Sequence, residues 1–404
     1  MKKNNRSIFL SKWFSLKLFL FAFGISINIF CQPDSLKKKY SPIPIHGFYD
    51  SSHHWYDIKD EERAIDPLQN QQRYKPDEIL KIADNILLYQ KSNGGWPKNY
   101  DMLAVLTDDQ RLSVLKTKKN LNTTFDNGAT HSHLEYLIKV YASTKIKKYK
   151  DAVLNGLKFV LSAQYQNGGW PQYFPDRSGY RKYITFNDGA MIGIMNLLKK
   201  IVDKNEDYTF IDQTAYSKIK SAFENGLNCI IKCQIKDIGQ LLVWCQQHDD
   251  KKLKPQNART FEPACICNGE SADIVSFMMS IENPNQKIIA SIQNAVKWFN
   301  QSKIFGIRVQ EISAPNVAYQ YHSTSMDRII VEDAKAPPIW ARYYELETHR
   351  PLFCNRDGIP VYSLAEVDRE RRTGYGWYTY APQDVLNKYL DWQKKWAPNE
   401  NVIQ

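Results

Sequence analysis

The sequence lacks the short motifs that mark several common kinds of active site. Its seven cysteines include no CxxC pair, and no histidine stands near them at zinc-site spacing, so a structural zinc is not expected. No GxSxG motif is present, so the histidines have no nucleophilic serine of the elbow type to activate. These absences argue against thiolate metal centres and serine hydrolases.

Long apolar runs are also scarce. The main one, residues 18–30, is shorter than the roughly 20 residues that span a bilayer, and Asn28 interrupts it. Five basic residues and no acid precede it, and small Cys31 follows it. This pattern predicts a cleaved signal peptide over residues 1–31 and a secreted or periplasmic product without stable membrane insertion. A transmembrane anchor and a lipoprotein anchored at Cys31 are the alternatives.

Acidic residues are outnumbered by basic ones. The 54 Lys and Arg against 43 Asp and Glu give a formal net charge of +11, and removing the five basic residues of the leader leaves +6. Such an excess favours an acidic partner, which composition alone does not choose among nucleic acid, membrane surface and polyanionic polymer. No nucleic-acid-binding module is present, so no nucleic-acid partner is expected.

An internal repeat organises the rest of the chain. A glutamine followed five residues later by a glycine recurs three times, and a TF(D/N/E) element follows each copy. Seven segments around these elements space apolar residues at three and four, which predicts helices. A unit of two such helices cannot bury its apolar faces alone, so we predict an all-α fold of repeated helical hairpins. The repeated positions are Gln90, Gln164 and Gln234, then Thr124, Thr185 and Thr260.

The acids of the TF(D/N/E) elements are candidate ligands. Asp126 by itself is typical of a helix N-cap. If the hairpins close, however, Asp126, Asp188 and Glu262 gather at one rim, where like charges require a cation. Hard carboxylate oxygens suit Ca²⁺.

Three arginines are candidates for anion binding. Arg259 stands before TFE where the other copies have neutral residues, which indicates either a specialised role or a salt bridge to a neighbouring carboxylate. Arg328 lies in MDRIIVEDA, and Arg342 is expected at the start of an aromatic-rich helix. Both could serve as forks for a carboxylate.

Seven ordered motifs resemble those of the family 10 pectate lyases, from about Pro76 to Trp396. They are NGGWPK, TTFDNGATHSHLEYL, NGGWPQ, ITFNDGAM, VWCQQHD, ARTFEP with NGES, and WARYYEL through ERRTGYGWY. The resemblance implies an (α/α)3 toroid, in agreement with the three repeats. It also implies calcium-dependent β-elimination of polygalacturonate, the pectin backbone, to 4,5-unsaturated oligogalacturonates.

The resemblance further implies roles for individual residues. Arg259 would be the base that removes the C5 proton of a uronate. Asp126 and Asp188 would hold the calcium, with Asp126 also serving the substrate. Lys98, Arg328 and Arg342 would bind the substrate.

Other interpretations remain open at this point. The Gln–Trp pattern also resembles the repeats of terpene cyclases, although the chain has no DxDD motif, and a non-catalytic pectin-binding protein could share the fold. Cys265 and Cys267 stand where small polar residues are expected, so the sequence does not predict the conformation of their loop. We predict a signal peptide over 1–31, an N-terminal extension or linker over 32–73, a catalytic domain over 74–404, and a monomer.

Overall fold

The protein is described by a computed structural model that covers residues 40–58 and 62–403. These residues belong to one compact unit, Tyr40–Gln404. The predicted leader and Cys31 lie outside the described residues. No helix among the described residues is long and apolar enough to cross a membrane.

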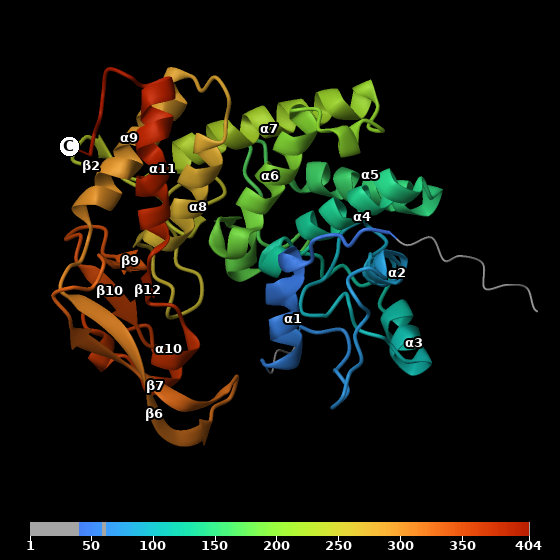
Figure 1. Ribbon diagram of the computed structural model, residues 1–404, viewed down its shortest axis with the longest axis horizontal. Coiled ribbons are helices and arrows are strands. Elements are labelled where there is room, and N and C mark those ends of the chain that lie inside the picture. Colours follow the sequence, from blue (N-terminus) through green and yellow to red (C-terminus); the bar gives the residue numbers. More distant parts are fainter. Residues whose placement is uncertain (1–39, 59–61, 404) are drawn as a thin grey trace, which may run out of the picture. The chain divides into compact units, whose positions relative to one another are not determined.

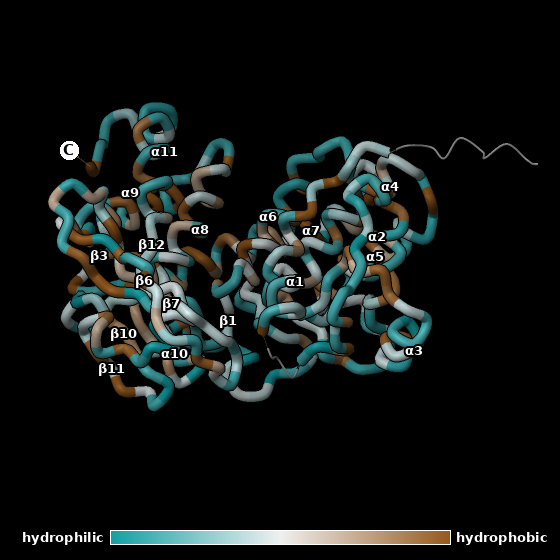
Figure 2. The backbone as a smooth tube through the Cα atoms, turned by 60° about the horizontal axis from the view of Figure 1, so that its bottom comes forward, coloured by the Kyte–Doolittle hydropathy of each residue, from teal (hydrophilic) through white to brown (hydrophobic). Residues whose placement is uncertain are grey.

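Helical hairpins form one part of this unit, and all seven segments with helical periodicity are helices (Figure 1). Within the hairpins α4 packs on α5, α6 on α7 and α8 on α9, while α2, α4, α6, α8 and α11 follow one another as neighbours. Figure 2 shows hydrophobic stretches along these helices, whereas peripheral α3 is mostly hydrophilic. Their bounds are α2 (Ile79–Tyr89), α3 (Asp108–Lys116), α4 (His131–Thr144), α5 (Lys147–Ala163), α6 (Ala190–Val202), α7 (Gln213–Cys233), α8 (Asn268–Met279), α9 (Gln286–Gln301) and α11 (Ala381–Trp396).

The repeated glutamines join each helix end to the next hairpin. The Gln90 amide donates to the backbone oxygens of Gly94 and Ala152, both at 2.9 Å. Gln164 makes the equivalent bonds to Gly168 and Ala222 at 2.9 and 2.8 Å. Gln234 donates in the same way to Leu242 and Ser291 at 2.8 and 3.0 Å. The repeat thus encodes a side chain that ties the loop after its own helix to a backbone carbonyl within the second helix of the next hairpin.

Buried tryptophans repeat beside these glutamines. The indoles of Trp96, Trp170 and Trp244 are fully buried and donate to Ile86, Val160 and Ile230 at 2.8, 2.8 and 2.7 Å. Their preceding turns require glycine, because a Cβ on Gly94 or Gly168 would lie 2.4 or 2.0 Å from a backbone oxygen of the next hairpin. Both glycines also have φ near +95° (96° and 94°).

The prediction of an all-α (α/α)3 toroid is wrong, because the fold is mixed α/β with several antiparallel sheets. Strands β6 (Ile307–Ala318) and β7 (Ser323–Glu332) form a long hairpin with an irregularity between Ser313 and Val317. Its side chains are half-exposed on both faces, so the sequence carries little of the apolar alternation that marks a strand.

The other strands are too short to produce any periodicity. One sheet has the order β11-β10-β9-β5, and three pairs are β1–β4, β2–β3 and β12–β8. The expectation of a helix at Arg342 is also wrong, since that residue joins β8 to β9. The bounds are β1 (Ile184–Thr185), β2 (Lys236–Asp237), β3 (Gln240–Leu241), β4 (Gln247–His248), β5 (Ile266–Cys267), β8 (Trp340–Ala341), β9 (Tyr343–Tyr344), β10 (Pro351–Cys354), β11 (Pro360–Val361) and β12 (Tyr378–Thr379), with α10 at Arg369–Gly374.

The segment before the repeats packs onto them. A 3-10 turn η1 (His46–Phe48) leads into α1 (Tyr49–Tyr56), and Trp55 is fully buried. The carboxylate of Asp101 holds α1 in place, because it accepts hydrogen bonds from Ser52 and Tyr56 at 3.1 and 2.9 Å. The six cysteines among the described residues are free and buried.

Candidate active site

Two equivalent turns carry the predicted aspartates. The 3-10 turns η2 (Asp126–Gly128) and η4 (Asn187–Gly189) precede α4 and α6 and lie against each other. The middle residue is left-handed in both, with φ of 50° at Asn127 and 49° at Asp188. Two elements far apart in sequence therefore bring Asp126 and Asp188 to one place, as the repeat predicted.

Asp126 is a buried, ion-paired carboxylate and not a helix cap. It is 2% exposed, and Lys98 Nζ lies 2.7 Å from its Oδ2. The other oxygen, Oδ1, has no hydrogen-bond partner among the described residues. Although burial opposes ionisation, Lys98, then hydrogen bonding by Gln172 and then Arg259 hold the pKa of Asp126 below its ordinary value. The site thus contains a charged carboxylate whose Oδ1 accepts no well-aligned hydrogen bond in the described part of the chain.

Asp188 stands in the opposite electrostatic situation. Its Oδ2 accepts a hydrogen bond of 2.7 Å from the Asn187 amide, but it has no ion pair among the described residues. The Asp188 side chain is accessible to solvent, but the protein packed around it, together with the charges of Asp126 and Asp50, raises the pKa of Asp188 well above its usual range, against the smaller effects of Arg342 and Arg259. A cation at this place would relieve that repulsion.

Arg259 forms a salt bridge with Glu262, which is one of the two interpretations that the sequence allowed. Its Nε lies 2.8 Å from Oε2 of Glu262, and its guanidinium lies over the Phe261 ring at 4.7 Å. Glu262 is 1% exposed and also accepts a 2.9 Å hydrogen bond from Tyr375. Because Glu262 is paired in this way, it neutralises Arg259 instead of adding a free charge to the aspartates.

Arg342 contacts the turn η4, which carries Asp188. Its Nη2 donates to Asn187 Oδ1 at 3.0 Å and forms an ion pair with Glu270. The guanidinium lies 4.5 Å from the centre of the Tyr375 ring. Burial opposes its charge, but Glu270 and the neighbouring tyrosines hold the pKa of Arg342 well above its ordinary value. The arginine is therefore a fixed cation beside η4.

Arg328 and Lys98 have different settings. Arg328 lies on β7, where it pairs with Glu311 at 3.1 Å and donates to the backbone oxygen of Tyr375 at 3.1 Å. It thus ties the long hairpin to the loop of Tyr375. Lys98 is close to Asp126, as described, and also lies 3.3 Å from Glu62.

Several residues of this group were not among the predicted site residues. Glu270, Asn187 and Tyr375 lie within motifs that the sequence did single out, so their position in NGES, TFNDGA and GYGWY was a usable signal. Asp50 of α1, whose pKa is raised by burial and by Asp126, comes from a segment with no such signal.

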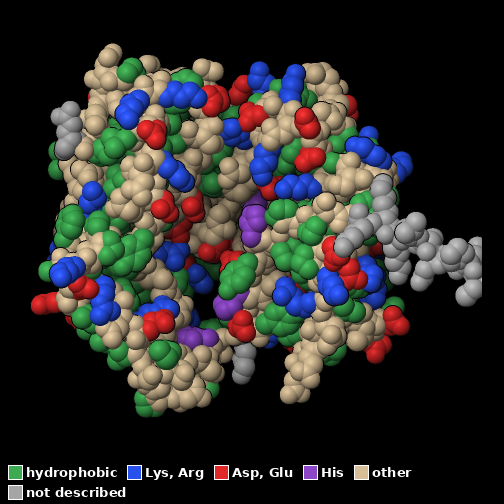
Figure 3. Space-filling model, in the orientation of Figure 1, with side chains coloured by type: hydrophobic (Ala, Val, Ile, Leu, Met, Phe, Trp, Pro, Cys, Tyr) green, Lys and Arg blue, Asp and Glu red, His purple; other side chains and the backbone are tan. Residues whose placement is uncertain are grey.

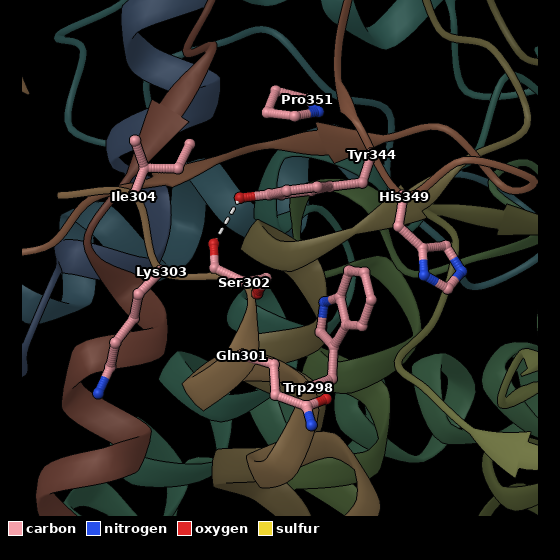
Figure 4. Close-up of a pocket in the computed structure, with 8 residues that line it drawn as sticks. All are labelled: Trp298, Gln301, Ser302, Lys303, Ile304, Tyr344, His349 and Pro351. Atoms are coloured by element: carbon pink, nitrogen blue, oxygen red, sulfur yellow. Dashed lines mark hydrogen bonds between the residues drawn. The ribbon is translucent and has the colours of Figure 1, made fainter.

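A hollow lies near the centre of the face in Figure 3, with acidic and basic side chains along it and histidines at its rim. A separate cavity of about 380 Å³ lies between Trp298, Tyr344 and His349, and none of the predicted site residues lines it (Figure 4). The Tyr344 hydroxyl there donates to the backbone oxygen of Ser302 at 2.8 Å.

Among the described residues, no three Asp, Glu, His or Cys side chains converge in a metal-binding arrangement. A cation held by Asp126 and Asp188 would take its remaining ligands from backbone, amide, water or substrate oxygens. The buried Oδ1 of Asp126 and the crowded carboxylate of Asp188 are hard oxygen donors that fit such an ion.

Comparisons with known proteins show the family to which this chain belongs. The profile of the pectic acid lyase family matches residues 90–386. Two similar solved structures are a family 10 polysaccharide lyase from Cellvibrio cellulosa and a mutant form of it in complex with trigalacturonic acid. Each has a TM-score of 0.67 and 30% identity, and covers 77% of this chain and 91% or 92% of its own. Among curated proteins, no sequence matches this chain.

The family match excludes the terpene-cyclase alternative, and it also indicates an enzyme instead of a pectin-binding protein without turnover. The chain belongs to the pectic acid lyase family and is a pectate lyase, a polysaccharide-cleaving enzyme of the lyase class.

Proposed function

We propose that this pectate lyase cleaves polygalacturonate by calcium-assisted β-elimination, with Arg259 as the base and 4,5-unsaturated oligogalacturonates as products. The observation that carries the proposal is the pair of unlike aspartates beside two arginines. Asp126 keeps one unsatisfied charged oxygen, and Asp188 lacks a cation partner among the described residues. Export of the enzyme is proposed from the leader pattern of residues 1–31.

Asp126 and Asp188 would hold the calcium, since both offer hard oxygens and the two turns lie against each other. When bound, Ca²⁺ supplies Lewis-acid neutralisation of a substrate carboxylate. That carboxylate would also be held by Arg342, whose guanidinium is fixed by Asn187 and Glu270. The ion pair with Lys98 keeps Asp126 ionised, so its carboxylate stays available as a calcium ligand.

Arg259 would remove the C5 proton, which is α to the held carboxylate and only weakly acidic. The electron pair of the C5–H bond forms the C4–C5 double bond, the C4–O bond breaks, and water protonates the leaving oxygen. To act as a base Arg259 must be neutral, yet Glu262 holds its pKa well above the ordinary range against the effect of burial. Arg342 helps to lower the pKa of Glu262, so this counter-ion stays charged beside Arg259. Because the high pKa of Arg259 disfavours its neutral form at neutral pH, we expect lyase activity to be highest at alkaline pH.

The test is to incubate the purified protein with polygalacturonate, with Ca²⁺ or with a chelator, and to follow the ultraviolet absorbance of the unsaturated product. We expect a rise that requires Ca²⁺. Arg259→Ala should abolish turnover while trigalacturonate binding persists. Arg308→Ala is the matched control, because Arg308 is similarly exposed (41% against 44%) and also paired with an acid. Full activity of Arg259→Ala would contradict the base assignment.

A further inference from the structure

A continuous row of side chains runs from the start of α8 to Asp188. The Cys267 thiol donates to Oε2 of Glu270, and Oε1 of Glu270 pairs with Arg342. Arg342 donates to Asn187 Oδ1 at 3.0 Å, and the Asn187 amide donates to Asp188 Oδ2 at 2.7 Å. Each member therefore orients the next.

Glu270 is the member that fixes the others. It is 7% exposed and lies in the first turn of α8, where the helix dipole favours a carboxylate. One of its oxygens accepts from a thiol and the other from a guanidinium, so both are held in defined directions. Replacing it frees the guanidinium of Arg342 from its only acidic side-chain partner among the described residues.

The backbone around Arg342 is fixed independently of Glu270. Its amide donates to Trp377 at 2.7 Å, and its carbonyl accepts from the amide of Asn268 at 2.8 Å. Cys267 pairs with Tyr343 between β5 and β9. Because these backbone contacts hold the loop, a change at Glu270 should alter where the guanidinium points and leave the chain path intact.

We infer that Glu270 is a positioning residue of the active site, which aims the Arg342 guanidinium at a substrate carboxylate with the help of the Cys267 thiol. The inference rests on the proposed function. It gives Cys267 a role, although the sequence alone only showed this cysteine as a departure from the expected small polar residue.

Kinetics of Glu270→Gln give the first test. This variant keeps the volume and removes the charge. Since Arg342 would already hold the carboxylate in the ground state, KM for polygalacturonate should rise roughly tenfold, about the loss of one hydrogen bond to a charged group. The value of kcat should also fall, because negative charge builds up on that carboxylate as the C5 proton leaves, and a displaced guanidinium would stabilise it less. An unchanged KM would overturn the inference.

A double-mutant cycle separates positioning from a general structural effect. Glu270→Gln combined with Arg342→Ala should have the same KM as Arg342→Ala alone, since Glu270 would act only through that arginine. Effects on KM that multiply would contradict the inference. Glu282→Gln is the matched control, because Glu282 is exposed and pairs with Lys395 at 3.0 Å. It should leave both constants unchanged.

Two replacements of Cys267 keep the test decisive if Glu270→Gln does not fold. Cys267→Ser retains a donor for Glu270, whereas Cys267→Ala does not. We expect Cys267→Ala to raise KM about twofold to threefold, roughly the loss of one modest hydrogen bond, and Cys267→Ser to restore most of it. Equal KM values for the two variants would count against the network.

The outcome for the wild type distinguishes the two proposals. If the wild type does not cleave polygalacturonate, the proposed function fails, and the network is then tested by calorimetric binding of trigalacturonate to the same variants. If the wild type cleaves it and the variants match the wild type in KM, only the positioning role of Glu270 fails.

Discussion

The turns η2 and η4 share one backbone conformation but hold their aspartates in opposite electrostatic states. Asp126 occupies the first position of its turn, is buried and is paired with Lys98. Asp188 occupies the second position, is accessible to solvent, and is crowded by Asp126 and Asp50 without an ion pair among the described residues. A shift of one position in the repeat thus changes what the carboxylate contacts.

The comparison separates two roles that the repeat alone does not distinguish. Asp126 has a lowered pKa, and the pairing of its charged form stabilises the folded chain. Asp188 carries repulsion that only a cation or protonation relieves, so its charge is costly in the free enzyme. We therefore expect Asp126 to serve both folding and function, and Asp188 to serve function at the expense of stability.

Removing Asp126 should have the largest effect. Asp126→Ala leaves the ammonium of Lys98 buried with only the more distant Glu62 as its acidic partner. Breaking a buried ion pair in this way costs about 3–5 kcal/mol, and activity should fall below detection. Chemical denaturation and the absorbance assay measure the two losses.

The control is Asp151→Ala, which removes an exposed acid paired with Lys147 at 2.6 Å. Because exposed pairs contribute little, its effect should be within about 1 kcal/mol. Equal destabilisation by the two variants would mean that the Asp126–Lys98 pair is not a stabilising contact.

Removing the charge of Asp188 should abolish activity without destabilising the protein. Asp188→Asn relieves the repulsion by Asp126 and Asp50, so the melting temperature measured in chelator should stay the same or rise. Ca²⁺ should raise the melting temperature of the wild type, because a ligand that binds the folded state stabilises it. It should not do so for Asp188→Asn. If Asp188→Asn is less stable than the wild type in chelator, Asp188 stabilises the fold as Asp126 does, and the two turns do not differ in this respect.

The helices and the meeting of the two turns could be predicted from the sequence, because both follow from a repeated pattern. The three-and-four spacing predicted seven helices, and the repeated TF(D/N) elements before two of them predicted that Asp126 and Asp188 lie together. The partner of Arg259 was foreseen as one of two alternatives, since a carboxylate stands three residues later.

The strands and the wider network could not be predicted in the same way. The β6–β7 hairpin is half-exposed on both faces, and most other strands are two residues long, so neither carries a period. The contact of Glu270 with Arg342 spans 72 residues and depends on the pairing of β5 with β9, which no local pattern specifies. Asp50 reaches the site only because α1 folds back onto η2.

The pH dependence of stability gives the smallest and finest test of the contrast. With the folded pKa of Asp188 raised above its ordinary value of 3.8, the folded state binds a proton more tightly than the unfolded state. The wild type should therefore lose stability relative to Asp188→Asn as pH rises from that value through the folded pKa. Asp126 has the opposite sign, because its folded pKa is lowered.

The stabilisation by Asp126 is complete above its ordinary value and is lost as pH falls through its folded pKa. Urea denaturation in chelator at a series of pH values measures both effects for the wild type and Asp188→Asn. Curves that run parallel from pH 3.8 upward would show that Asp188 is not crowded by its acidic neighbours, and the two turns would then differ in position but not in charge state.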